Sequence, residues 1–131
     1  MAPIIHTMIR VHELERSLKF YADALALSVS HRLDFPDFSL VYLRNGENDV
    51  EIELTWNKGR AEPYSQGDGY GHIAVAVENL DAENERITVA GIQPAPIKEF
   101  KRGDEMLARF FFIQDPDGYK IEMLQRAGHY V

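Results

Sequence analysis

The stretch HTMIRV at residues 6–11 and the stretch HIAVAV at residues 72–77 begin two similar halves of this 131-residue chain. In each half, a strand pattern is followed by a helical pattern and then by three further strand patterns. No linker or low-complexity tract separates the halves. The sequence therefore predicts an α+β fold in which one domain contains two βαβββ modules, at about residues 1–66 and 67–131.

The alternation of apolar and polar residues defines the expected elements. Strands are expected near residues 3–11, 27–34, 38–44, 49–56, 71–78, 94–99, 106–114 and 118–125, and helices near residues 13–25 and 80–90. In the strand at 49–56, Ile52 and Leu54 point to one face, whereas Glu51 and Glu53 point to the other. In the strand at 71–78, the face that carries His72 is otherwise lined by small residues. Such a face predicts a cavity.

Composition excludes several classes of protein. Hydrophobic residues make up 45% of the chain, which is enough for a core, and cysteine is absent. Disulfides, thiolate zinc sites and cysteine nucleophiles are therefore excluded, and a metal must be held by His, Asp or Glu. No apolar run approaches the roughly 20 residues of a membrane span, and residues 1–10 lack a secretory layout. We expect a cytoplasmic protein with no membrane partner.

Charge argues against a nucleic-acid partner. The net charge of −7 is spread evenly, with 7 basic and 10 acidic residues up to residue 66 and 7 basic and 11 acidic residues after it. Phosphate binding needs a concentrated basic face, and none is found here. An anionic small molecule would need its own Arg or Lys clamp.

Four residues stand at equivalent places in the duplicated pattern. His6 and His72 lie in the first strands of the halves, and Glu53 and Glu122 lie in the last strands. Their offsets of 66 and 69 positions agree. Taken singly, each histidine is more often a structural residue and each glutamate more often part of a solvated face. A pseudo-two-fold relation between the halves would bring all four to equivalent places.

Two imidazoles and two carboxylates suit a borderline divalent ion such as Ni, Co, Zn, Fe or Mn. With positions left open for water or substrate, such a metal can polarise a carbonyl while a glutamate moves a proton.

Several motifs resemble one enzyme family. They are HTMIRV at 6–11, FYADALAL at 20–27, IELTWN at 52–57, GYGHIAVAV at 69–77 and DPDGYKIEM at 115–123. In this order, from about residue 4 to residue 125, they resemble glyoxalase I, the lactoylglutathione lyase of the vicinal-oxygen-chelate (glyoxalase/bleomycin-resistance/dioxygenase-like) superfamily. The DPDG segment is expected to be a turn that aims the last strand.

The resemblance implies a methylglyoxal-detoxifying homodimer with active sites at the subunit interface. Each site would take His6 and Glu53 from one chain and His72 and Glu122 from its partner. It would hold one divalent metal with two waters, with Ni or Co favoured by the compact length and Zn possible. The reaction would isomerise the methylglyoxal–glutathione hemithioacetal to S-D-lactoylglutathione through an enediolate. Glu122 corresponds to the principal base, and Glu53 would serve the opposite enantiomer.

The resemblance implies glutathione as the co-substrate. Arg10 and Asn57 match the positions at which the family binds glutathione. Arg10 lies on the same strand face as His6, so its guanidinium can reach the same cavity. As alternatives to glutathione binding, Arg10 could form a surface ion pair and Asn57 could be a plain turn residue that ends its strand. Asp68 stands where some relatives have a basic residue. Lys101 and Arg102 would either clamp the glycine carboxylate of glutathione or be solvated loop charges.

Two other functions compete with this one. A non-catalytic member of the same superfamily would bind a drug or toxin in the cavity, but such binders commonly lack one or more of the four metal residues. A ring-cleaving iron dioxygenase is disfavoured, because Glu53 would crowd the positions that oxygen and a diol require.

Overall fold

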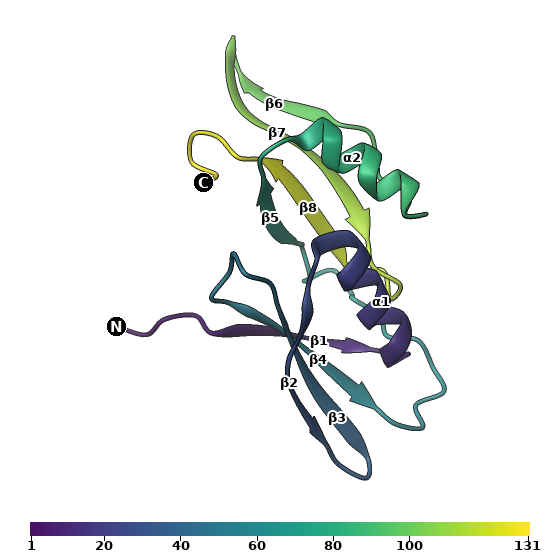
Figure 1. The fold of residues 1–131 in the computed structure, drawn as a ribbon. Coiled ribbons are helices and arrows are strands. Elements are labelled where there is room, and N and C mark those ends of the chain that lie inside the picture. Colours follow the sequence, from purple (N-terminus) through teal and green to yellow (C-terminus); the bar gives the residue numbers. More distant parts are fainter. The chain divides into compact units, whose positions relative to one another are not determined.

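The computed structural model describes residues 1–131 as two compact units, Met1–Ser65 and Gln66–Val131. Each unit contains one helix and a four-stranded sheet, in the element order βαβββ (Figure 1). The predicted α+β fold class with two βαβββ modules is therefore confirmed.

The first unit has its first and last strands side by side. Its elements are β1 (His6–Val11), α1 (Leu14–Leu25), β2 (Ser28–Asp34), β3 (Phe38–Arg44) and β4 (Glu51–Asn57). The sheet order is β1-β4-β3-β2, with β1 parallel to β4 and the other pairs antiparallel. Parallel pairing of β1 with β4 places the start of the unit beside its end.

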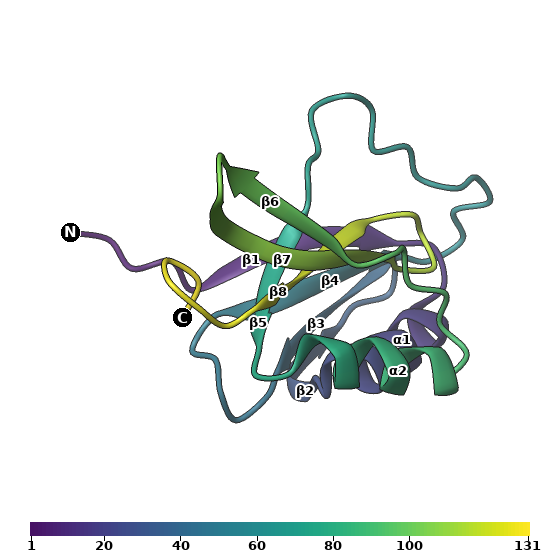
Figure 2. The same ribbon diagram turned by 90° about the horizontal axis from the view of Figure 1, so that it is seen from above.

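The second unit repeats this arrangement. Its elements are β5 (Ile73–Val77), α2 (Leu80–Val89), β6 (Lys98–Arg102), β7 (Glu105–Gln114) and β8 (Lys120–Gln125). The sheet order is β5-β8-β7-β6, and β5 is parallel to β8. A long loop without helix or strand connects β4 to β5 (Figure 2).

One face of each sheet is apolar and buried, as strand alternation requires. The buried apolar residues of the first unit include Leu14, Phe20 and Tyr21 on α1, and Val41, Leu43 and Leu54 on β3 and β4. Those of the second unit include Leu80 and Ile87 on α2, and Phe111, Ile113, Ile121 and Met123 on β7 and β8. The opposite face of each sheet is thereby left for the polar residues of the same strands.

The two helices differ in how they begin and end. Helix α1 has no side-chain cap at Glu13 and ends at Ala26, which adopts a left-handed conformation with φ 53°. Helix α2 begins after Asn79, whose side chain accepts a 3.0 Å hydrogen bond from the backbone N–H of Ala82. Such a cap satisfies one of the free N–H groups of the first turn. Neither helix is long and apolar enough to cross a membrane.

One predicted strand lies elsewhere. The strand expected at residues 94–99 begins only at Lys98 and runs to Arg102. Pro94 and Pro96 explain the shift, because proline has no backbone N–H to contribute to a strand ladder. Ala95 lies between the two prolines and before β6. Its backbone N–H still donates a 2.8 Å hydrogen bond to Phe112 O on β7.

An ion pair between Asp81 on α2 and Arg109 on β7 should make the stability of the fold depend on pH. Arg109 donates two hydrogen bonds to Asp81, at 2.8 and 3.0 Å, and they lower the pKa of the Asp81 carboxyl from its ordinary value of 3.8. A carboxyl with a lowered folded-state pKa stabilises the fold above its unfolded-state pKa, and the contribution is lost as the pH falls through the folded-state value.

We therefore expect Asp81→Asn to lower the free energy of unfolding slightly at pH 6. The difference from the wild type should begin to shrink as the pH falls below 3.8 and should be lost once the pH is below the lowered folded-state pKa, as measured by urea unfolding across the pH series. Glu85→Gln, on the exposed side of α2, is the control and should show no such pH-dependent difference. A difference that did not shrink as the pH fell below 3.8 would contradict the assignment.

Candidate metal centre

The first unit brings one imidazole to one carboxylate. His6 opens β1, and its Nε2 lies 3.2 Å from Glu53 Oε2 on β4. In the parallel register Glu53 lies opposite Met8, two residues after His6. Residues two apart in a strand point to the same face, so His6 and Glu53 meet above it. Glu53 is buried, with 9% of its surface exposed.

The second unit repeats this contact. His72 directly precedes β5, and its Nε2 lies 2.8 Å from Glu122 Oε2 on β8. Glu122 lies opposite Ala74, again two residues after the histidine. The predicted strand was to include His72, whereas β5 begins one residue later. Even so, all four predicted ligands fall into two pairs of the same geometry.

An aromatic ring accompanies each pair. The ring centroids of His6 and Tyr42 are 5.7 Å apart at 74°, and those of His72 and Phe112 are 5.3 Å apart at 77°. Tyr42 on β3 lies opposite Glu53, and Phe112 on β7 lies opposite Glu122. The sequence analysis missed both rings. An alignment of the two halves would have found them, since Tyr42 and Phe112 are 70 positions apart, close to the 69 positions between Glu53 and Glu122.

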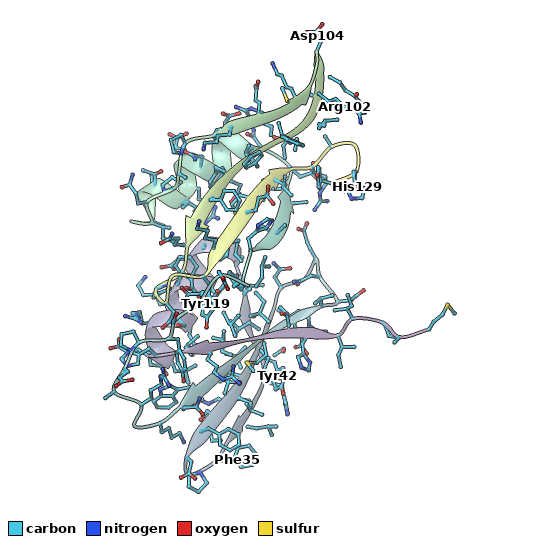
Figure 3. The ribbon with its side chains drawn as sticks, turned by 180° about the vertical axis from the view of Figure 1, so that it is seen from behind. Phe35, Tyr42, Arg102, Asp104, Tyr119 and His129 are labelled. Atoms are coloured by element: carbon cyan, nitrogen blue, oxygen red, sulfur yellow. The ribbon has the colours of Figure 1, made fainter.

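Tyr42 also lies opposite the glutamate of its unit. A hydrogen bond between its hydroxyl and Glu53 raises the pKa of Tyr42, and burial and the negative charges of Glu53 and Glu51 raise it further. The phenol is therefore neutral at physiological pH and is a hydrogen-bond donor. Figure 3 shows Tyr42 on the sheet of the first unit.

The spacing of the donor atoms fits a metal. Two ligands in adjacent positions of an octahedral ion, each about 2.1 Å from it, lie about 3 Å apart. The two imidazole–carboxylate distances, 3.2 and 2.8 Å, lie on either side of that value. No group of three or more His, Asp or Glu side chains that could hold a metal forms. Each unit thus brings two candidate donors together.

The two predicted thiol-binding residues lie toward the end of the first sheet. Arg10 is exposed on β1 opposite Thr55, and Asn57 ends β4. The Asn57 amide donates a 2.9 Å hydrogen bond to the Tyr64 hydroxyl, and the Arg60 guanidinium lies 4.0 Å from the centroid of the Tyr64 ring. Asn57 therefore anchors the loop that follows β4. Tyr64 and Arg60 carry no strand or motif signal, and the sequence analysis did not find them.

Lys101 and Arg102 are paired with acidic neighbours. Lys101 Nζ lies 3.3 Å from Glu99, and Arg102 lies 3.0 Å from Glu105, all on the exposed hairpin of β6 and β7. These pairs match the solvated-loop alternative, and the clamp for the glycine carboxylate stays a prediction.

The turn before β8 is confirmed. The buried Asp115 carboxylate accepts 2.9 Å hydrogen bonds from the backbone N–H groups of Asp117 and Tyr119. Gly118, with φ 90°, donates its N–H to Asp115 O at 3.0 Å. The chain is thereby reversed directly before the strand that carries Glu122.

Comparison with known proteins defines the class. The sequence profile of the Glyoxalase/Bleomycin resistance protein/Dioxygenase superfamily matches residues 4–123, and the chain belongs to this superfamily. It is 40% identical to the probable lactoylglutathione lyase of Synechocystis sp., over 93% of this chain and 94% of the relative. It is 38% identical to the lactoylglutathione lyase of Haemophilus influenzae, over 93% of this chain and 91% of the relative.

Solved structures agree with these relatives. The trypanothione-dependent glyoxalase I of Leishmania major is 34% identical, with a TM-score of 0.76 over 95% of this chain and 87% of that one. The antibiotic-binding protein TnmS3 from Streptomyces has a TM-score of 0.75 at 17% identity, over 95% of this chain and 96% of that one. The second likeness extends to the fold alone.

Proposed function

We propose that this chain is a lactoylglutathione lyase, glyoxalase I, which converts the hemithioacetal of methylglyoxal and glutathione into S-D-lactoylglutathione. The observation that carries the proposal is the repeated imidazole–carboxylate pair, at 3.2 Å in one unit and 2.8 Å in the other. Similarity to enzymes named lactoylglutathione lyase over almost the whole chain supports it. A cytoplasmic location fits this reaction, because the cytosol keeps glutathione reduced.

The four side chains of the two pairs would hold one divalent ion per site, with Ni or Co preferred to Zn. They are His6, Glu53, His72 and Glu122. When bound, the ion would supply Lewis-acid stabilisation of the negative charge that develops on the substrate oxygens. Imidazole and carboxylate donors are compatible with each of these ions.

The two glutamates would carry out the proton transfer. Glu122 would take the proton from the carbon that bears the sulfur and return it to the neighbouring carbon, so the chemistry is an isomerisation although the class name is lyase. Glu53 lies in the matching place of the other unit and would do the same for the opposite enantiomer. Each carboxylate is held near an imidazole, and this limits the directions in which it can meet a substrate.

Glutathione would be bound by Arg10 and Asn57. The exposed guanidinium of Arg10 shares a strand face with His6, and bidentate pairing with a carboxylate is the interaction for which arginine is best shaped. Asn57 donates to Tyr64 through its amide nitrogen and keeps its carbonyl oxygen as an acceptor for the peptide part of the thiol.

We propose further that residues 1–131 act as one domain in a homodimer with sites at the subunit interface. His6 and Glu53 of one chain would meet His72 and Glu122 of the partner. This arrangement is the one that the resemblance to glyoxalase I implies, and each unit supplies two of its four donors.

Metal replacement tests the activity. We expect a chelator to abolish thioester formation from methylglyoxal and glutathione. Added Ni or Co should restore it most fully, Zn and Mn less, as followed by thioester absorbance. A chain that no ion activates would contradict the proposal and favour the binding protein of the same superfamily.

Removing the base tests the mechanism. We expect Glu122→Gln to lower kcat by about 10²- to 10⁴-fold, because an amide cannot accept the proton, while the melting temperature stays near that of the wild type. Glu85→Gln, on the exposed side of α2, should leave kcat unchanged. Near-normal turnover by Glu122→Gln would assign the base elsewhere.

Mixing inactive chains tests the dimer. One variant carries His6→Ala and Glu53→Gln, and the other carries His72→Ala and Glu122→Gln. If sites form between subunits, half of the randomly mixed dimers hold one intact site of two, so activity should return to about a quarter of the wild-type value. Sites built within one chain would give no recovery, and that result would reject the shared site.

A further inference from the structure

The two histidines of the candidate metal centre are held in different ways. The ladder between β5 and β8 begins at Ile73, opposite Ile121, so His72 lies before the paired part of its strand. His6, by contrast, is part of β1 and pairs with Glu51 on β4. Strand pairing therefore fixes one histidine and not the other.

The segment before β5 has little order of its own. Residues 70–72 adopt neither helix nor strand. Gly69 and Gly71 flank Tyr70, and a β-carbon added at either glycine would meet no atom within 4 Å. Packing therefore does not restrain these glycines, and glycine itself adds conformational freedom to the backbone. His72 needs another restraint if its imidazole is to stay beside the carboxylate of its pair.

A hydrogen bond from Tyr70 supplies this restraint. Its hydroxyl donates to Lys120 O at 3.0 Å. Lys120 is the first residue of β8 and directly precedes Ile121, where pairing with β5 begins. The bond thus continues the connection between the two segments beyond the end of the ladder. Tyr70 and Lys120 each lie two residues before a member of the imidazole–carboxylate pair, so the bond joins the chain at equal distances from both members.

The Tyr70 ring rests on a well-fixed turn. It meets the buried Tyr119 ring edge-on, with 5.3 Å between the centroids and 68° between the planes. The Asp115 carboxylate accepts the backbone N–H of Tyr119 at 2.9 Å, and the backbone N–H of Asp115 donates to Tyr119 O at 2.9 Å. A donor that packing already holds orients its acceptor at little further cost in conformational entropy.

Gln66 ties the other end of the same loop to this turn. Its side-chain amide donates a 2.7 Å hydrogen bond to Asp117 O. A β-carbon added at Gly118 would lie 3.3 Å from Gln66 Oε1, so the loop and the turn are in close contact there. The loop of residues 66–72 is therefore joined at two points to the segment that leads into β8.

The first unit has no counterpart of the Tyr70 hydroxyl. The residue two positions before His6 is Ile4, which is exposed and has no side-chain donor. Backbone pairing takes its place, because the Glu51 N–H donates a 2.9 Å hydrogen bond to Ile5 O just before β1. The tyrosine contact thus occurs in the unit whose histidine lies outside the ladder.

We propose that Tyr70 is a positioning residue that holds His72 beside Glu122. It acts through the backbone of the segment before β5 and not by contact with a metal or a substrate. The proposal rests on the proposed function in taking His72 and Glu122 as metal ligands. It does not depend on which reaction the metal serves.

Removal of the hydroxyl tests this role. We expect Tyr70→Phe, which keeps the ring contact with Tyr119, to weaken Ni binding by about tenfold, measured by competition with a chromogenic chelator. In the metal-free protein, the imidazole NMR signals of His72 should change, while those of His6 stay as in the wild type. With saturating Ni, kcat should stay within about threefold of the wild type, because the bound ion itself orders its ligands.

Control variants separate positioning from damage to the fold. Tyr130→Phe removes a hydroxyl from the C-terminal turn, where its ring contacts His129, and should change neither Ni affinity nor the His72 signals. Melting temperatures of all variants are measured without metal. If Tyr70→Phe does not fold, Gln66→Met replaces it, because the loss of the Gln66 amide frees the same loop from the turn and should likewise weaken Ni binding.

The outcomes distinguish the role of Tyr70 from the proposed function. In an active wild type, a Tyr70→Phe variant with Ni affinity within about twofold of the wild type would overturn the role and leave the function standing. Weaker Ni binding with changed His72 signals, in a chain that makes no thioester, would support the role and reject the function. Equal changes at His6 and His72 would indicate general damage and overturn the role. A wild type that binds no Ni would overturn both.

Discussion

Parallel pairing of the first and last strands of each unit is the constraint on which the candidate site depends. It sets β4 beside β1 and β8 beside β5, so that a histidine at the start of one strand meets a glutamate on the other. In both units the glutamate lies opposite the residue two positions after the histidine. A shift of one residue in either register would move the glutamate to the apolar face, where a charged side chain without a partner is costly.

The parts that could be predicted from sequence are those with a short-range signal. The alternation of apolar and polar residues around Glu53 predicted that its side chain lies on the polar face of the sheet. The duplication of the sequence predicted that His6 and His72 lie at equivalent positions. The start of β6 was misplaced because the apolar pattern outweighed the lack of an N–H at Pro94 and Pro96. The position of Tyr42 beside Glu53 has no short-range signal, since it depends on how β3 aligns with β4. Only the register of the folded sheet brings that side chain next to a carboxylate.

A duplicated fold does not need duplicated chemistry. The units share strand order, the imidazole–carboxylate contact and the edge-on aromatic ring, but they differ in the groups placed around that contact. Changes on the polar face leave the buried apolar face intact, so each half can vary its chemistry at small cost to packing. The same reasoning accounts for a superfamily that groups glyoxalases, bleomycin resistance proteins and dioxygenases.

The left-handed Ala26 at the end of α1 has a consequence for engineering. Ala26 caps the C-terminus of the helix with φ 53°. This left-handed conformation costs an L-residue with a β-carbon about 1–2 kcal/mol more than it costs glycine. The connection into β2 contributes none of the donor residues. Replacing Ala26 by glycine should therefore raise the thermal stability of the protein without altering any donor residue, which would suit it to use at higher temperature.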